Sequence, residues 1–209
     1  MADGRSDHTT PPRRLTASAN GNAIRLGFFV VLAASAVAFD LSTKDRVFAA
    51  LGLGGRHLVW SVQETPVFSL TTSLNRGALF GIGQNFTGLF SALSLAATAF
   101  VLYWQFFRVR SWWLTVALGL IQGGILGNLY DRLGWHGIID SSGEKVLAVR
   151  DFLFFELIRF PIFNFADSFL VIGAAMLLLA SWWELEPAEE ETGAALAAAG
   201  SAAGDNAAS

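Results

Sequence analysis

The sequence contains no cysteine, which excludes disulfides, thiol nucleophiles and cysteine-ligated metal sites. Its three histidines, His8, His57 and His136, are scattered and form neither an HExxH motif nor another zinc-binding spacing. The chain also lacks a GxxxxGK[ST] nucleotide loop, a GxSxG nucleophile elbow, and the GxGD and DTG signatures of two aspartic protease classes. We therefore predict no metal and no cofactor, and we exclude zinc, cysteine and GxSxG-type serine hydrolysis.

Charged residues are also scarce, at 15% of the 209 residues against about 25% in ordinary soluble domains. Hydrophobic residues make up 53% and aromatic residues 13%. The net charge of −3 and the lack of a basic stripe give no indication of nucleic-acid binding. This composition predicts an integral membrane protein.

Four apolar runs, at residues 24–39, 88–107, 112–130 and 160–183, are each about long enough to cross a bilayer. Small residues at 35–38 leave a cleavable signal peptide as the alternative for the first run. Residues 45–87 have the short alternating pattern of strands outside the bilayer. The polar segments 1–22 and 187–209 are predicted to be disordered tails around a membrane domain at 23–186.

An even number of spans places both termini on the same side of the membrane. Arg108 and Arg110 form a compact basic loop between the second and third spans, and further arginines precede the first span. Basic residues favour the cytoplasmic side, so both termini are predicted to be cytoplasmic.

Polar residues gather at the predicted outer ends of the spans. Asp40 and Lys44 are four residues apart, in the order that favours a helical ion pair, and this pair is either structural or part of a site. Asn128 lies one turn from Asp131 and Arg132, which predicts a bracing role for its amide. In the same span, a small residue recurs at every fourth position, at Gly119, Gly123 and Gly127, which allows close approach of another helix.

The fourth run begins with the sequence "FPIFNFADSF", in which Pro161 suits the first turn of a helix. Asn164, Asp167 and Ser168 then share one helix face. A carboxylate in such an apolar segment indicates either a functional site or a buried hydrogen bond between helices.

A second carboxylate beside Asp167 would allow the two groups to share one proton. One group would then act as a base toward water while the other donates to a scissile carbonyl. Two acids, Asp140 and Asp151, lie in the segment before the fourth run. A non-enzymatic carrier that uses Asp40, Asp131 and Asp167 as a proton or cation path is the alternative, although no internal repeat supports it.

Five short motifs occur in the order that resembles lipoprotein signal peptidases, also called signal peptidase II. They are "DLSTK" with Asp40 and Lys44, "NRGALFG" with Asn75, Gly77 and Phe80, "GGILGNLYDRL" with Gly127, Asn128, Asp131 and Arg132, "VRDF", and "FNFADS". The resemblance covers about residues 24–183. It implies an α-helical integral membrane protein with four transmembrane helices, and an extracytoplasmic β-cradle at about 45–87 between the first and second helices.

The resemblance also implies an aspartyl endopeptidase of the bacterial inner membrane, with its active site near the outer face. Such an enzyme cuts prolipoproteins just before a diacylglyceryl-modified cysteine, so its partners are these substrates and membrane lipid, and we expect a monomer. The catalytic pair carries over to Asp151 and Asp167. The supporting residues carry over to Asp40, Lys44, Asn75, Gly77, Asn128, Arg132 and Asn164.

The first catalytic position has two candidates, because the family places this aspartate soon after the "DR" box. Spacing favours Asp140, whereas Asp151 has the aromatic-rich successor of the family motif but requires an insertion of about eleven residues. We prefer Asp151 and predict that residues 140–150 form a small surface hairpin.

Overall fold

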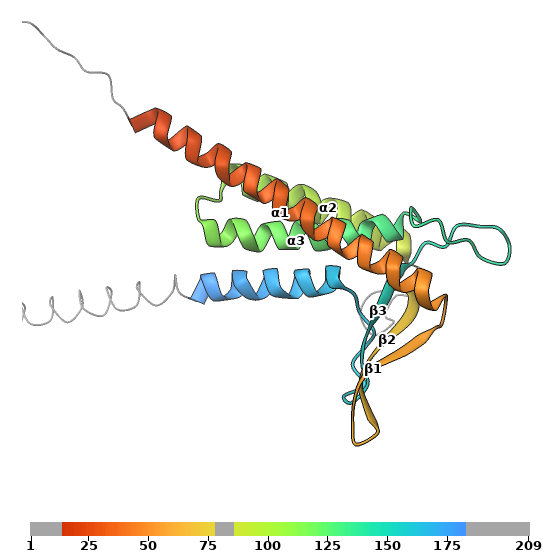
Figure 1. Cartoon of the computed structure of the whole chain (residues 1–209). Coiled ribbons are helices and arrows are strands. Elements are labelled where there is room, and N and C mark those ends of the chain that lie inside the picture. The colour runs from red at the N-terminus through yellow and green to blue at the C-terminus, as the bar shows by residue number, and fades with distance from the viewer. Residues whose placement is uncertain (1–13, 78–85, 183–209) are drawn as a thin grey trace, which may run out of the picture.

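The computed structural model describes residues 14–77 and 86–182, with side chains from residue 21 onward. Four helices in this part of the chain are long and apolar enough to cross a membrane, and they run side by side in one bundle (Figure 1). They are Gly21–Leu51 within α1 (Arg14–Leu51), α2 (Thr87–Phe107), α3 (Trp112–Arg132) and a fourth helix, Phe165–Trp182. The four predicted spans are confirmed.

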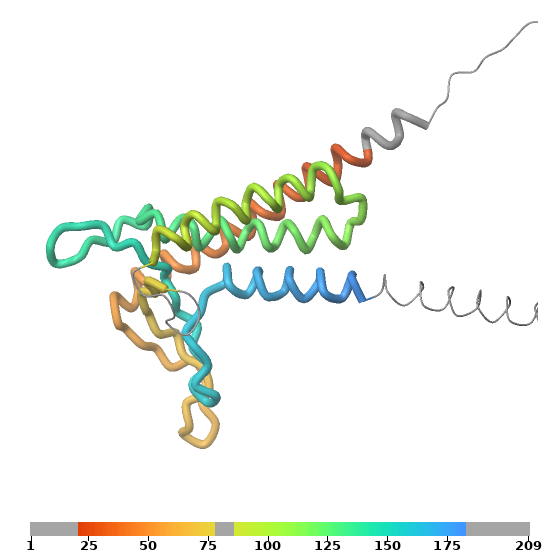
Figure 2. Tube along the Cα trace, turned by 180° about the vertical axis from the view of Figure 1, so that it is seen from behind, coloured from red at the N-terminus to blue at the C-terminus, as the bar shows by residue number. Residues whose placement is uncertain are grey.

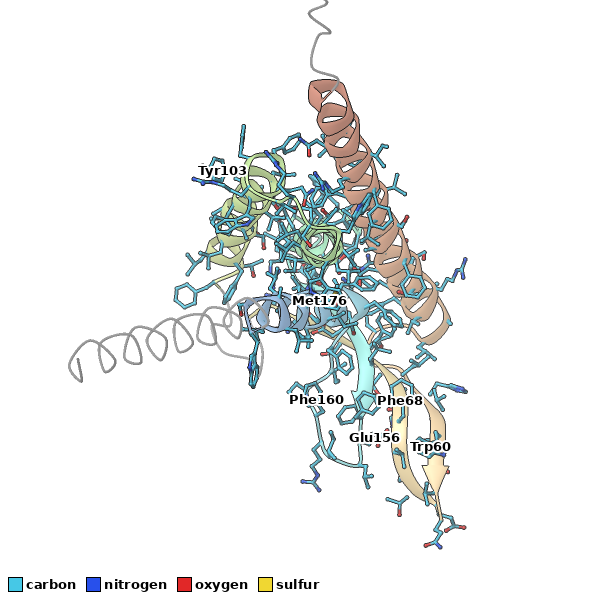
Figure 3. All side chains as sticks on the ribbon, turned by 90° about the vertical axis from the view of Figure 1, so that its left-hand side faces the viewer. Trp60, Phe68, Tyr103, Glu156, Phe160 and Met176 are labelled. Carbon is cyan, nitrogen blue, oxygen red and sulfur yellow. The ribbon has the colours of Figure 1, made fainter. Side chains whose placement is uncertain are left out.

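Helix α3 lies at the centre of the bundle, and 56% of its most apolar window is buried against 22% or less in the other three spans. Figure 3 shows the same arrangement, with α3 surrounded by the other helices. Its glycine stripe packs against α1, where a Cβ on each glycine would lie within 2.9 Å of an α1 side chain. The predicted close approach is therefore confirmed, and the facing pairs are Gly119 with Leu32, Gly123 with Ala36, and Gly127 with Asp40.

A three-stranded antiparallel sheet lies at one end of the bundle and projects to its side (Figures 1 and 2). The strand order is β1 (Arg56–Val62), β2 (Thr65–Asn75) and β3 (Val149–Phe155). Gln63 and Glu64 connect the first two strands with positive φ angles, as a tight two-residue hairpin requires. The N-terminal end of α1 and the C-terminal end of the fourth helix lie at the opposite end of the bundle from the sheet (Figure 2).

The sheet differs from the prediction in two respects. Residues 45–51 belong to α1, which continues to Leu51, so the strands begin later than predicted. The third strand comes from the segment between the third and fourth spans, because β3 pairs with β2 through contacts far apart in the sequence. The cradle is therefore built from two separate parts of the chain.

Two helix starts also differ from the prediction. Helix α1 begins at Arg14, inside the predicted disordered tail, because no proline follows Pro12 until Pro66 to interrupt it. The fourth helix begins at Phe165, so Pro161 precedes it and is not in its first turn. Residues 1–13 and 183–209 and the motif residue Phe80 lie outside the described residues, and the predictions for them stay predictions.

Candidate active site

Asp167 lies in the first turn of the fourth helix, where it forms a reciprocal cap with Asn164. The Asn164 side-chain oxygen accepts the Asp167 backbone N–H at 3.0 Å, and Asp167 Oδ2 accepts the Asn164 backbone N–H at 3.2 Å. This is the geometry of a capping box, which satisfies two backbone donors at a helix N-terminus. The positive end of the helix dipole also favours a carboxylate here. The cost of placing Asp167 in an apolar segment is thus offset locally.

Strand β3 holds Asn164 in place through the residue before it. Phe163 forms a bridge with Leu153 in which its N–H donates to the Leu153 carbonyl at 3.1 Å and its carbonyl accepts the Leu153 N–H at 2.8 Å. Asn164 is fully buried and donates its amide to Asp151 Oδ1 at 2.7 Å. Asn164 therefore contacts both Asp151 and Asp167 and links strand β3 to the fourth helix.

Asp151 lies on β3 and is 3% exposed. Its partner in the β2–β3 register is Ser73, so Asn75, two residues further along β2, is a diagonal neighbour on the same face. Asn75 donates its amide to Asp151 Oδ2 at 3.1 Å. Burial, together with the charge of Asp167, raises the pKa of Asp151 to about 7, although the amide donors oppose this rise.

Asn128 on α3 links the two carboxylates to a buried ion-pair network. Its amide nitrogen donates to Asp167 Oδ1 at 2.8 Å, and its oxygen accepts from Asn164 at 3.0 Å and from Lys44 Nζ at 3.1 Å. The predicted bracing of Asp131 and Arg132 by Asn128 is wrong, because its hydrogen bonds go to other helices. Asp131 and Arg132 lie one turn away on the same helix, but the packing of the helices brings other hydrogen-bond partners to the Asn128 side chain.

The ion-pair network holds α1, α3, β3 and the fourth helix together. Lys44 is fully buried and lies 2.6 Å from Asp40 and 3.2 Å from Asp131, so the predicted helical pair is confirmed. Asp40 also accepts the backbone N–H of Ala166 at 2.9 Å, in the first turn of the fourth helix. A mutually bonded network of this kind positions the elements that carry the two aspartates.

Arg150 is the residue of this region that sequence reasoning missed. It is 3% exposed, its backbone N–H and its Nε both donate to Asp131 at 3.0 Å, and its guanidinium also pairs with Asp45. Successive strand residues point to opposite faces, so Arg150 faces α3 while Asp151 faces Asn75 and Asn164. The sequence signal that could have identified Arg150 is its place next to Asp151 in an otherwise apolar strand.

Asp140, the competing candidate, lies in the segment between Gly137 and Val146 and is exposed. Its Oδ1 accepts hydrogen bonds from the Ser142 hydroxyl and backbone N–H and from the Glu144 N–H. These bonds lower the pKa of Asp140, so it is an ordinary ionised turn residue. The bridge between Ile139 and Lys145 closes a small hairpin that overlaps the predicted segment 140–150. The last two residues of that segment belong to β3 instead.

The two remaining predicted residues also lie at the site. Gly77 is buried, and its N–H donates to the Asn75 side-chain oxygen at 3.0 Å, which orients the Asn75 amide toward Asp151. Arg132 is half-buried on α3 and interacts electrostatically with Asp167 and Asp151. The structure therefore brings all nine predicted site residues to one region, at the junction between the bundle and the sheet.

This arrangement is suited to acid–base chemistry on a polar bond. Two carboxylates from different elements accept hydrogen bonds from the same buried residue, Asp151 from the side-chain amide of Asn164 and Asp167 from its backbone N–H. The pKa of Asp151 is near neutrality, and the guanidinium of Arg132 lies nearby. A pair of this kind can hold one proton in common and use it as both acid and base.

The chain is similar to known proteins along most of its length. The family model described as signal peptidase (SPase) II matches residues 32–183. A lipoprotein signal peptidase of Rhodopirellula baltica is 40% identical over 178 residues, which are 83% of this chain and 79% of that protein. A lipoprotein signal peptidase of Desulfitobacterium hafniense is 40% identical over 137 residues, covering 65% and 83% of the two chains.

The fold is similar to that of a solved bacterial membrane enzyme. The TM-score is 0.63 at 25% sequence identity, and the likeness covers 76% of this chain and 89% of the solved one. The family model alone spans more than half of the chain, and the structure supplies the four membrane-spanning helices. The chain therefore belongs to the signal peptidase II family and is a multi-pass membrane peptidase.

Proposed function

We propose that this chain removes signal peptides from diacylglyceryl-modified prolipoproteins by an aspartic mechanism, cutting before the lipidated cysteine. Family membership supports the reaction and the substrate, and it favours this function over the carrier alternative. The observation that carries the aspartic assignment is that Asn164 bonds to both carboxylates. Its side-chain amide donates to Asp151, and its backbone N–H donates to Asp167.

In the proposed mechanism Asp151 carries the shared proton and Asp167 is ionised. Asp151 is the more buried group, with a pKa near 7, whereas Asp167 lies at a helix N-terminus beside Arg132. A water would sit between the two carboxyl groups. Asn75, Asn128 and Asn164 would hold both groups in place throughout the reaction.

The water oxygen adds to the scissile carbonyl carbon while Asp167 takes one water proton. Asp151 gives its proton to the carbonyl oxygen, which forms a neutral tetrahedral gem-diol. The C–N bond then breaks as the proton on Asp167 moves to the leaving nitrogen, and one gem-diol hydroxyl returns its proton to Asp151. General acid–base catalysis of this kind contributes about 10²–10⁴-fold.

The position of the pair at the end of the bundle suits a substrate that is itself anchored in lipid. The diacylglyceryl chains would stay in the bilayer among the helices, while the peptide crosses the junction between bundle and sheet. We place this junction at the outer membrane face, both termini in the cytoplasm, and one copy of the chain as the active unit. The basic loop at Arg108 and Arg110 supports this orientation.

The test is to replace Asp151 or Asp167 with Asn and to assay the purified enzyme on a diacylglyceryl-modified prolipoprotein. Each variant should lose activity by about 10²-fold or more, because Asn retains the shape but cannot transfer the proton. Thermal unfolding in detergent should show that both variants remain folded. Cleavage at the wild-type rate by either variant would overturn the aspartic assignment.

Asp140→Asn is the matched control, since it makes the same substitution in the competing aspartate. Its hydrogen bonds are all local to the hairpin, so activity should stay close to that of the wild type. A loss equal to that of Asp151→Asn would favour the alternative alignment. Wild-type cleavage in detergent without ions or a gradient separates the peptidase from a carrier.

A further inference from the structure

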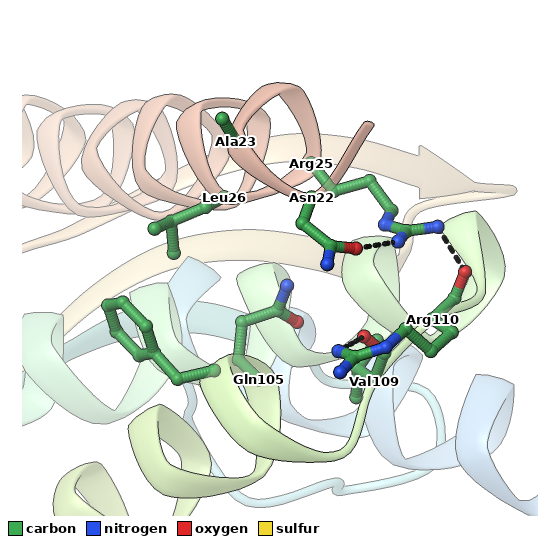
Figure 4. A pocket seen from close by; sticks show the side chains of 8 residues that line it. Asn22, Ala23, Arg25, Leu26, Gln105, Val109 and Arg110 are labelled. Carbon is green, nitrogen blue, oxygen red and sulfur yellow. Dashed lines mark hydrogen bonds between the residues drawn. The ribbon is translucent and has the colours of Figure 1, made fainter. Parts of the chain in front are cut away.

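A second polar site lies at the other end of the bundle from the two aspartates. It is a cavity of about 160 Å³ between residues 22–26 of α1 and the segment where α2 ends and the loop to α3 begins (Figure 4). Arg25 and Arg110 line it together with the amide of Gln105, and Leu26 and Val109 add apolar walls. None of these side chains contacts the proposed catalytic site.

The two arginines bring positive charge into this cavity, and no carboxylate of the described residues pairs with either of them. Arg25 donates to the Asn22 side-chain oxygen and to the Arg110 carbonyl, and Arg110 donates to the Val109 carbonyl at 3.1 Å (Figure 4). All three acceptors are neutral, and within the described residues neither guanidinium forms an ion pair. A guanidinium has five N–H donors, so most of the donors of both groups are available to a ligand. Two such cations at one cavity favour a bound anion.

Gln105 provides an independent indication of a ligand. The residue is 5% exposed, and its amide nitrogen donates to Thr115 Oγ1 at 3.5 Å. Its Oε1 is buried and has no hydrogen-bond partner among the described residues. Buried polar atoms are rarely left unpaired, so an acceptor at this position indicates a missing donor. The ligand should therefore combine an anionic group with an O–H or N–H group.

The aromatic side chains around the cavity indicate the kind of ligand. Exposed aromatic side chains surround this end of the bundle, among them Tyr103, Trp104, Trp112 and Trp182, which are 44–67% exposed. Trp and Tyr gather at the level of lipid headgroups in membrane proteins. Phe106 also lines the cavity and is 51% exposed, so the apolar outer surface of the bundle reaches the cavity, as an amphiphile requires. Anionic phospholipids supply a phosphate at this level of a membrane.

We propose that this cavity binds the headgroup of an anionic phospholipid of the phosphatidylglycerol type. Arg25 and Arg110 bind its phosphate, because guanidinium groups match phosphate oxygens in geometry and charge. Gln105 Oε1 accepts a hydrogen bond from a glycerol hydroxyl of the headgroup. The lipid joins residues 22–26 of α1 to the α2–α3 loop. The site does not depend on the proposed peptidase mechanism.

The experiment is native mass spectrometry of the full chain in detergent, titrated with phosphatidylglycerol or phosphatidylcholine. The wild type should retain one phosphatidylglycerol at least tenfold more tightly than phosphatidylcholine. Arg25→Gln combined with Arg110→Gln should lose this preference. Arg108→Gln is the matched control, because it removes a cation from the same loop but does not line the cavity, and it should bind as the wild type does.

Gln105→Leu removes no charge and tests the hydroxyl contact separately, with an expected loss of about threefold or more. Equal binding of the two lipids by the wild type, or an unchanged preference in the double Arg variant, would overturn the proposal. An Arg108→Gln loss equal to that of the double variant would do so as well. Displacement of the lipid by millimolar inorganic phosphate would identify a small-anion site instead. Lipid binding only after removal of residues 184–209 would identify the acidic tail as the occupant.

Discussion

The Asn75→Ala variant should move the alkaline limb of the pH–activity profile to higher pH. Asn75 donates to Asp151 Oδ2 at 3.1 Å and so stabilises the ionised form of a carboxyl group that is 3% exposed. The pKa of Asp151 is already raised to about 7 by burial and by the charge of Asp167. In the proposed mechanism Asp151 must be protonated, so activity falls as pH rises through this pKa.

The size of the shift follows from the lost hydrogen bond. A hydrogen bond to a charged group contributes about 1.5–3 kcal/mol, and one pKa unit corresponds to about 1.4 kcal/mol. Removing the Asn75 amide should therefore raise the apparent pKa of the pair by about 1–2 units, from about 7 toward 8 or 9. This value belongs to the coupled pair, because two interacting carboxyl groups titrate together.

The assay measures kcat/KM against pH on a diacylglyceryl-modified prolipoprotein. The pH at which the alkaline limb falls does not depend on how much the variant lowers the maximal rate. Thr71→Ala is the control. Thr71 lies on the same strand, and among the described residues its hydroxyl has a hydrogen bond to Ser69 alone. Its limb should coincide with that of the wild type. A limb that stays in place or moves to lower pH in Asn75→Ala would refute the assignment of Asp151 as the acid.

Two further predictions concern the scaffold, and thermal unfolding in detergent measures both. Lys44→Met leaves buried carboxylates without their cation and should cost about 3–5 kcal/mol, a fall of about 6–20 °C in the midpoint, whereas adding Asp40→Asn should recover most of it. A double variant no more stable than the single one would contradict this reasoning. Gly124→Ala places a methyl group 2.5 Å from the Ala166 carbonyl and should cost about 1–3 kcal/mol, whereas Gly27→Ala, with open space around it, should be neutral or stabilising. Equal midpoints for these two glycine variants would exclude tight packing between α3 and the fourth helix.

Much of the membrane architecture was predictable from local sequence patterns. The four spans follow from the length of the apolar runs, and the Asp40–Lys44 pair follows from helical spacing. The close approach of another helix to α3 follows from a glycine at every fourth position, starting at Gly119, whereas the structure identified that helix as α1. Each of these features depends on residues within one helix, whose geometry fixes which side chains share a face.

The sheet was predicted less well because its third strand is distant in sequence from the other two. Residues 45–87 show the pattern of strands, but nothing local indicates that Val149–Phe155 pairs with β2. The sequence analysis also missed that residues 45–51 are helical. Helix α1 continues beyond the apolar run to Leu51, and the end of an apolar run does not mark the end of a helix. Strand propensity is a property of one segment, whereas strand pairing depends on which other segments the fold places next to it.

By itself, the sequence determined the four spans, the polar groups at their ends and the family motifs that carry the candidate residues. Only the tertiary structure decided which residues these groups contact. The β2–β3 register and the Phe163 bridge place Asp151, rather than Asp140, against Asn164, and the alternation of β3 buries Arg150 against Asp131. Asp167 likewise proves to be a helix-capping residue, which its sequence neighbourhood did not reveal. Motifs record which side chains are present, but hydrogen bonds between separate elements exist only once packing has brought those elements together.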